Sequence, residues 1–99
     1  MKKEQILQTL RSNKSILTDR FSIETIGIFG SMARGTHHAD SDLDLVYVTQ
    51  PKHTIGYGLK IELEQYLKNL LSVAKLDLVN AKYLNPIVQQ AMAKDVIYV

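Results

Sequence analysis

Three short runs rich in β-branched, Leu and aromatic residues alternate with segments whose apolar residues recur every three or four positions. The runs cover residues 22–29, 43–49 and 73–79, and the recurring patterns cover 3–18, 59–71 and 85–92. The runs are typical of strands and the recurring patterns of amphipathic helices. This alternation predicts a layered α/β or α+β domain in which helices pack on one face of a small mixed sheet.

Length and composition narrow the class of protein. At 99 residues the chain is expected to form a single domain over residues 1–99. It contains no cysteine, which excludes disulfides, thiolate metal sites and a cysteine nucleophile. Its apolar stretches all fall short of the roughly 20 residues that span a bilayer, and the N-terminus does not resemble a signal peptide. We therefore expect a cytoplasmic protein without membrane association.

The charge balance argues against a nucleic-acid ligand. The chain has 12 basic and 10 acidic residues, a net charge of +2, and its one basic run is Lys2-Lys3. Proteins that bind nucleic acid directly usually concentrate basic side chains on one face. Direct nucleic-acid binding is therefore not expected.

A pair of acids stands at the start of the second predicted strand. Asp42 and Asp44 are two residues apart, so both side chains point to the same face, about 6.6 Å apart along the backbone. Two like charges this close need compensation, and a magnesium ion shared with substrate phosphates would provide it. Alternatively, the two acids are exposed residues at the end of a loop, where aspartate is common.

Gly30 and Ser31 end the first strand and open a predicted short helical turn over residues 31–34. Glycine permits a ligand to approach the backbone closely, and free N–H groups at a helix start favour an anion. The Ser31 hydroxyl can donate to a phosphate oxygen, or it can be simply an N-cap. Followed by the acid pair, this segment predicts a site that holds a triphosphate beside its metal ion.

A third acid interrupts the last predicted strand. Burying a lone carboxylate is costly, so Asp77 calls for an explanation. If its strand lies beside that of Asp44, the carboxylates could together hold two magnesium ions about 3.5–4 Å apart. Asp77 would then also take part in deprotonating the attacking hydroxyl. The alternative is an acid on an edge strand that faces solvent.

Two other segments have simpler interpretations. His37 and His38 lie in a polar loop over residues 36–41 and are expected to be solvated, because magnesium prefers oxygen ligands. The apolar face from Leu84 to Met92 is expected to be core, with part of it available to a partner. Asn85 and Pro86 predict the start of that helix.

The spacing of these motifs resembles a known signature. Gly30-Ser31 followed ten residues later by Asp42-x-Asp44 resembles the DNA polymerase β-like nucleotidyltransferase superfamily. The strings 26–35 and 41–45 are similar to those of its minimal nucleotidyltransferases, the MNT proteins. Residues 76–79 are similar to the strand that carries the third carboxylate of this family, and the closing helix is similar to its last element.

The resemblance implies a role for each of these residues. Gly30 and Ser31 would contact the phosphates of ATP. Arg34, in the family pattern Gly-Ser-x-Ala-Arg-Gly, would either reach the triphosphate or pack the loop. Two Mg²⁺ ions would be held by the three carboxylates, the third of which also acts as the base: Asp42, Asp44 and Asp77.

The family also implies a partner. MNT proteins are typically encoded beside a HEPN-domain toxin and act as its antitoxin, transferring AMP from ATP to a toxin tyrosine. The resemblance therefore implies an adenylylating (AMPylating) antitoxin that forms a hetero-oligomer with its HEPN toxin. The alternative is an antitoxin that neutralises the toxin by binding alone, with its nucleotide site idle.

Overall fold

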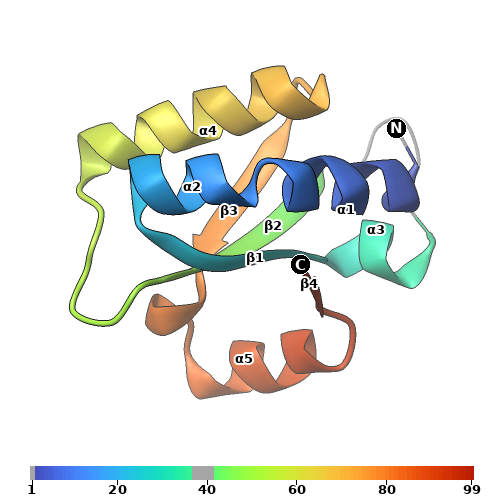
Figure 1. The fold of residues 1–99 in the computed structure, drawn as a ribbon. Coiled ribbons are helices and arrows are strands. Elements are labelled where there is room, and N and C mark those ends of the chain that lie inside the picture. Colours follow the sequence, from blue (N-terminus) through green and yellow to red (C-terminus); the bar gives the residue numbers. More distant parts are fainter. Residues whose placement is uncertain (1, 37–41) are drawn as a thin grey trace.

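The computed structural model describes residues 2–36 and 42–99, so His37, His38 and the rest of the loop to Ser41 lie outside the described residues. Helices and strands alternate along the chain (Figure 1). In order, the elements are α1 (Lys3–Ser12), α2 (Lys14–Phe21), β1 (Ile23–Phe29), α3 (Gly30–Arg34), β2 (Leu43–Thr49), α4 (Tyr57–Leu71), β3 (Leu76–Asn80), the 3₁₀ turn η1 (Ala81–Tyr83), α5 (Pro86–Ala93) and β4 (Ile97–Tyr98).

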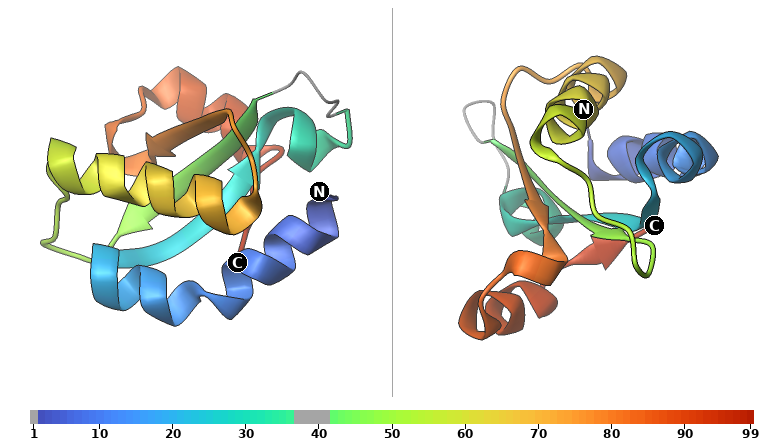
Figure 2. Two further views of the ribbon diagram at one scale, coloured as in Figure 1. Left: turned by 90° about the horizontal axis from the view of Figure 1, so that it is seen from above. Right: turned by 90° about the vertical axis from the view of Figure 1, so that its left-hand side faces the viewer.

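A four-stranded mixed sheet organises the fold. Its strand order is β3-β2-β1-β4, and β1 runs antiparallel to both β2 and β4. β2 and β3 are parallel, and α4 makes the crossover between them, as a parallel connection requires. Helices α1, α2 and α4 cover one face of the sheet, whereas α5 lies on the other side (Figure 2). The predicted mixed sheet is confirmed, and α5 is the helix that departs from the one-face arrangement.

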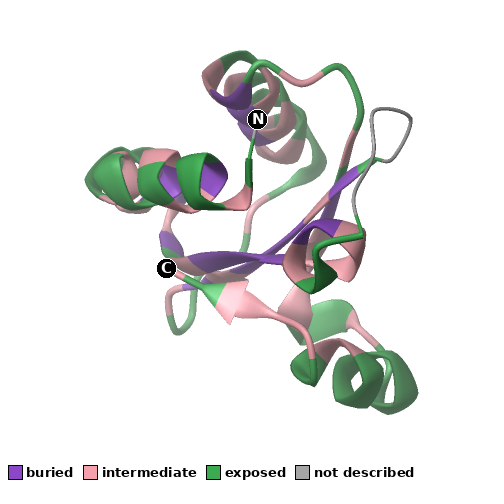
Figure 3. Ribbon diagram, turned by 90° about the vertical axis from the view of Figure 1, so that its right-hand side faces the viewer, coloured by how far each residue is buried: buried purple, intermediate pink, exposed green. Residues whose placement is uncertain are grey.

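The hydrophobic core lies between the sheet and these three helices. Alternate strand residues point into it, because successive side chains of a strand face opposite sides. Figure 3 shows the buried residues along the sheet and the inner sides of the helices. The largest fully buried side chains are Phe21, Ile6, Leu10, Leu17, Ile23, Ile26, Ile28, Leu43, Leu45, Leu63, Leu67 and Leu71. Within the described residues, no helix has both the length and the apolar character needed to cross a bilayer.

The first helix is broken where the sequence predicts continuity. Residues 3–18 were expected to form one helix, but α1 ends at Ser12 and α2 starts at Lys14. Asn13 between them leaves the helical conformation, with φ −109° and ψ 12°, and its side-chain amide donates to the carbonyl of Thr9 at 2.9 Å. Asparagine competes in this way for backbone groups, which is why it favours helix ends.

The C-terminal helix begins as predicted but does not join the core. Asn85 caps it by accepting a hydrogen bond from the Val88 N–H at 2.9 Å, and Pro86 is its first residue. However, Ile87 is 80% exposed, and none of the described residues of α5 is buried. The prediction that the face from Leu84 to Met92 is core is therefore wrong. Periodicity shows that a helix is two-sided, but not whether another element packs against its apolar side.

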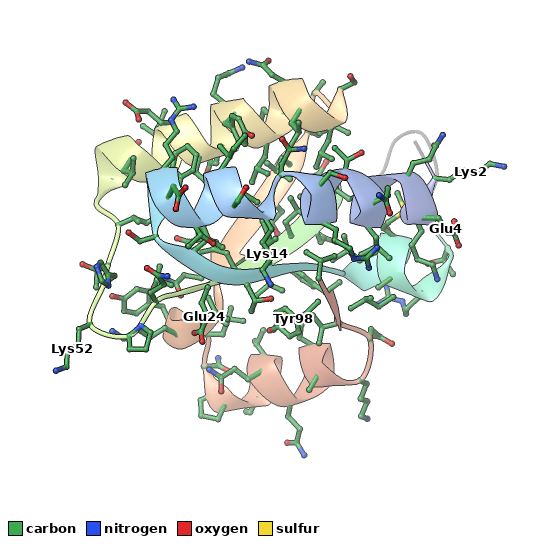
Figure 4. The ribbon with its side chains drawn as sticks, in the orientation of Figure 1. Lys2, Glu4, Lys14, Glu24, Lys52 and Tyr98 are labelled. Atoms are coloured by element: carbon green, nitrogen blue, oxygen red, sulfur yellow. The ribbon has the colours of Figure 1, made fainter. Side chains whose placement is uncertain are left out.

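The end of the chain is tied to both α2 and β1. The Val99 N–H donates to the carbonyl of Ile26, and the Val99 carbonyl accepts from the Thr25 hydroxyl and from Lys14 Nζ, all within 2.9 Å. Lys14 reaches from its helix toward this segment in Figure 4. The strand after α5 is thereby held against the sheet, although α5 itself is exposed.

Candidate functional site

Two of the predicted acids stand side by side in the sheet. Asp44 of β2 and Asp77 of β3 are register partners in the parallel pair, which places their Cα atoms about 5 Å apart. Because Leu43 and Leu45 point into the core, Asp44 points to the opposite face of the sheet, and its register partner Asp77 points to that same face. The condition set from sequence, that the third strand lie beside the second, is met. The two carboxyl groups therefore share the face away from α1, α2 and α4.

Asp42 directly precedes β2 and is exposed. Asp77 is also exposed and belongs to an edge strand, whereas Asp44 is half-buried. Within residues 2–36 and 42–99, no three His, Asp or Glu side chains are gathered closely enough to hold a metal ion. The backbone therefore brings the three aspartates to the same end of the neighbouring strands β2 and β3, but their carboxylates do not converge as a set of metal ligands.

Gly30 brings the predicted phosphate-binding segment into contact with the predicted metal-binding acids. Phe29, the last residue of β1, pairs with Asp44, so the glycine that follows lies against the Asp44 side chain. A Cβ placed on Gly30 would overlap Oδ2 of Asp44 and lie 3.1 Å from its Cγ. Gly30 also has a φ of +71°, a conformation that strains residues with a Cβ. The backbone conformation strongly favours glycine here, and any residue with a Cβ would also have to displace the Asp44 carboxylate.

The short helix α3 carries the rest of the predicted phosphate-binding segment. Its N-cap is Phe29, so Ser31 is the second helical residue, and the alternative that Ser31 is simply an N-cap is wrong. Gly35 ends the helix in the left-handed conformation, with its N–H donating to the Met32 carbonyl at 3.3 Å. Five residues align few peptide dipoles, so an anion would rely on the local N–H groups and the Ser31 hydroxyl.

Arg34 closes α3 and contacts a residue that the sequence did not single out. Its NH1 nitrogen lies 3.3 Å from Oδ2 of Asp95, which follows α5. The two residues are 61 positions apart, and no local pattern connects them. Whether Arg34 reaches a triphosphate or packs the loop stays a prediction.

A separate cavity lies at the carboxyl ends of β2 and β3. Its volume is about 330 Å³, and its lining includes Tyr47, Asn80, Tyr57, Tyr83 and Lys60. Burial raises the pKa of the Tyr47 phenol, and the hydrogen bond from Asn80 partly opposes that rise. Tyr47 shares the core face with Leu45, so this cavity and the acids occupy opposite faces of the sheet.

The geometry agrees with the comparison to known families. A family model described as "Polymerase beta, Nucleotidyltransferase" matches residues 4–99. The chain belongs to this nucleotidyltransferase family. A relative from Thermococcus cleftensis, named protein adenylyltransferase MntA, is 36% identical over 97 residues, covering 97% of this chain and 94% of its own. The family predicted from the sequence motifs is confirmed.

Solved structures share the fold of this nucleotidyltransferase. A structure provisionally described as a minimal nucleotidyltransferase superposes with a TM-score of 0.76 and 30% identity, covering 98% of this chain and 95% of that one. The structure of a tri-AMPylated HEPN toxin from Shewanella oneidensis in complex with an MNT antitoxin also matches. It has a TM-score of 0.60 and 21% identity, and covers 97% of this chain and 66% of that one. At that identity, the second match establishes the fold alone.

Proposed function

We propose that this nucleotidyltransferase is a protein adenylyltransferase that transfers AMP from ATP to a tyrosine of a HEPN toxin and so acts as its antitoxin. The observation that carries the proposal is the register of Asp44 with Asp77, with Gly30 against Asp44. An acid pair beside a phosphate-binding segment suits the transfer of a nucleotidyl group. The relative named protein adenylyltransferase MntA and the MNT antitoxin found with its AMPylated HEPN toxin support the choice of reaction and partner.

The donor set fits magnesium. Carboxylate oxygens are the ligands that magnesium prefers, and it usually shares them with substrate phosphates. Asp42, Asp44 and Asp77 would hold the metal once their side chains turn toward one another, since their backbones already lie at the same end of β2 and β3. Bound there, one or two Mg²⁺ ions would supply charge neutralisation at the phosphates and the leaving pyrophosphate.

The chain's own residues would bind ATP and accept the proton. The N–H groups of α3 and the Ser31 hydroxyl donate to phosphate oxygens, and Gly30 lets the phosphates approach the backbone. The tyrosine oxygen forms a bond to the α-phosphorus while the bond from that phosphorus to the pyrophosphate oxygen breaks. The phenolic proton passes to Asp77, whose exposure leaves it accessible to an acceptor on another protein.

The second candidate is an antitoxin that acts by binding alone. Two observations favour it: Asp77 is an exposed acid on an edge strand, and the carboxylates of the described residues are not gathered as a metal site. In this case the nucleotide site would be idle, and the acids would be replaceable without loss of neutralisation.

One experiment separates the two. The purified protein is incubated with ATP, Mg²⁺ and its HEPN toxin, and the toxin is examined by intact-mass and peptide mass spectrometry. We expect one or more adenylyl groups on tyrosine, lost in Asp44→Asn. Asp19→Asn is the matched control, because Asp19 is an exposed acid on α2, on the other side of the sheet. Full neutralisation by Asp44→Asn without any adduct would favour binding alone.

A further inference from the structure

The contact between Arg34 and Asp95 joins the predicted phosphate-binding segment to the end of the chain. One nitrogen of the guanidinium, NH1, lies 3.3 Å from one carboxylate oxygen, Oδ2. The Arg34 side chain is 50% exposed and the Asp95 side chain 32% exposed. A solvated pair of this kind contributes little to the stability of a fold, and its interest is the position in which it places the Arg34 guanidinium.

Arg34 is a neighbour of Ser31 on the surface of α3. It follows Ser31 by three residues, and residues three apart on a helix are neighbours on one side of it. Ser31 in turn follows Gly30, which lies against the Asp44 carboxylate. The backbone of Arg34 is therefore about one helical turn from the place where the proposed triphosphate would bind.

Among the residues that the structure describes, the pair engages one end of the guanidinium. Arginine has five N–H donors in a planar fork, and the contact with Asp95 uses NH1 alone. The remaining nitrogens can donate to phosphate oxygens while NH1 stays on the carboxylate. Arginine is well suited to this, since its fork matches two oxygens of a phosphate at once.

Asp95 is itself held by the backbone around it. Its N–H donates to the Met92 carbonyl at 3.0 Å. Four residues later, the Val99 N–H donates to the Ile26 carbonyl of β1. The carboxylate that contacts Arg34 therefore stands on a segment anchored at both ends.

From this geometry we propose that Asp95 is a positioning residue, which orients the Arg34 guanidinium toward the triphosphate of the nucleotide. The inference rests on the proposed function, since it requires that ATP binds beside α3. A long side chain that is already held loses less freedom when its ligand arrives. From the usual cost of immobilising such a side chain, loss of Asp95 should weaken ATP binding roughly 2- to 10-fold.

The negative charge of Asp95 would act on ATP binding in the opposite direction, so the test distinguishes the two effects by whether binding weakens or tightens. A carboxylate near a triphosphate repels it, so removing Asp95 would tighten binding if it acted only as a charge. Because the pair is solvated, that repulsion is screened and is partly cancelled by Arg34 itself. Orientation of the guanidinium should therefore dominate.

The test is a double-mutant cycle with ATP and Mg²⁺ as the probe. Dissociation constants are measured by calorimetry for the unmodified protein and for Asp95→Ala, Arg34→Ala and the double variant, with Asp19→Ala as the control of equal charge change. We expect weaker ATP binding in Asp95→Ala, no change in Asp19→Ala, and no further loss when Asp95→Ala is added to Arg34→Ala. Asp95→Glu should restore part of the affinity, and equal melting temperatures would exclude a folding defect.

The outcomes separate this inference from the proposed function. Equal or tighter ATP binding in Asp95→Ala would overturn the role of Asp95 and leave the proposed function standing. A loss of the same size in the Arg34→Ala background would also overturn it, because the effect would not pass through Arg34. If the unmodified protein bound no ATP with Mg²⁺, the proposed function would fail, and the role of Asp95 with it.

Discussion

Replacement of Gly30 by alanine tests the central geometry of the site. The added Cβ would overlap the Asp44 carboxylate, and a residue with a Cβ would have to adopt a φ of +71°. The backbone strain costs about 1–2 kcal/mol. At roughly 4–8 °C per kcal/mol for a domain of this size, the melting temperature should fall by about 4–16 °C from strain alone. The Asp44 side chain, half-buried beside the glycine, must also move.

Gly35 offers a matched control within the same helix. Its φ is +80°, so alanine there carries the same kind of backbone strain, but the added Cβ has nothing within 4 Å. Thermal unfolding should therefore show a loss in both variants. Binding of ATP with Mg²⁺, measured by calorimetry, should fall further in Gly30→Ala than in Gly35→Ala, because Asp44 is displaced in the former alone. Equal nucleotide affinities in the two variants would refute the reasoning that the Gly30–Asp44 contact shapes the site.

Further changes test other parts of the structure. In Gly27→Ala the added Cβ would overlap a backbone carbonyl of β4, so hydrogen exchange at the Val99 amide should accelerate, and unchanged protection would contradict this contact. Burial raises the pKa of the Tyr47 phenol in the folded protein above the ordinary tyrosine value of about 10. As the pH rises past that value, the phenol is therefore deprotonated more readily in the unfolded chain than in the folded one. Denaturant unfolding should therefore show a free energy of unfolding that falls above pH 10, and less steeply in Tyr47→Phe. Ile87→Ser should change the free energy of unfolding by no more than about 0.5 kcal/mol, whereas Leu67→Ala, in the core, should cost about 2–5 kcal/mol.

The acid pair and the strands could be predicted because their signals are local. The second strand has the bounds 43–49 that its composition indicated, so Asp44 lies in the strand and Asp42 directly precedes it. That both side chains face one side stays a prediction from the alternation of a strand. The glycine before Ser31 was identified because glycine lets a ligand approach the backbone closely, and the structure adds a second reason for glycine there, the positive φ of Gly30. Its contact with Asp44 could not be foreseen, because it depends on how β1 and β2 pair.

The remaining features depend on tertiary arrangement. Adjacency of Asp77 to Asp44 requires a strand order that no single segment encodes, so it could be stated from sequence only as a condition. The position of α5 was predicted wrongly because the periodicity of its apolar residues does not show what packs against them. In the structure its apolar side lies outside the core, and Ile87 is largely exposed. Asp95 carried no signal at all, since its contact with Arg34 joins two exposed residues far apart in the chain.

Because β2 and β3 pair in a parallel register, packing of the hydrophobic core also fixes the alignment of Asp44 with Asp77. Leu78 is 4% exposed and follows Asp77 directly, so a slip of β3 by one residue would turn the acid into the apolar layer and the leucine out of it. A misaligned site is therefore also a misfolded domain, open to unfolding and degradation before it can bind a nucleotide. Selection for stable folding thus also maintains the alignment of the acids.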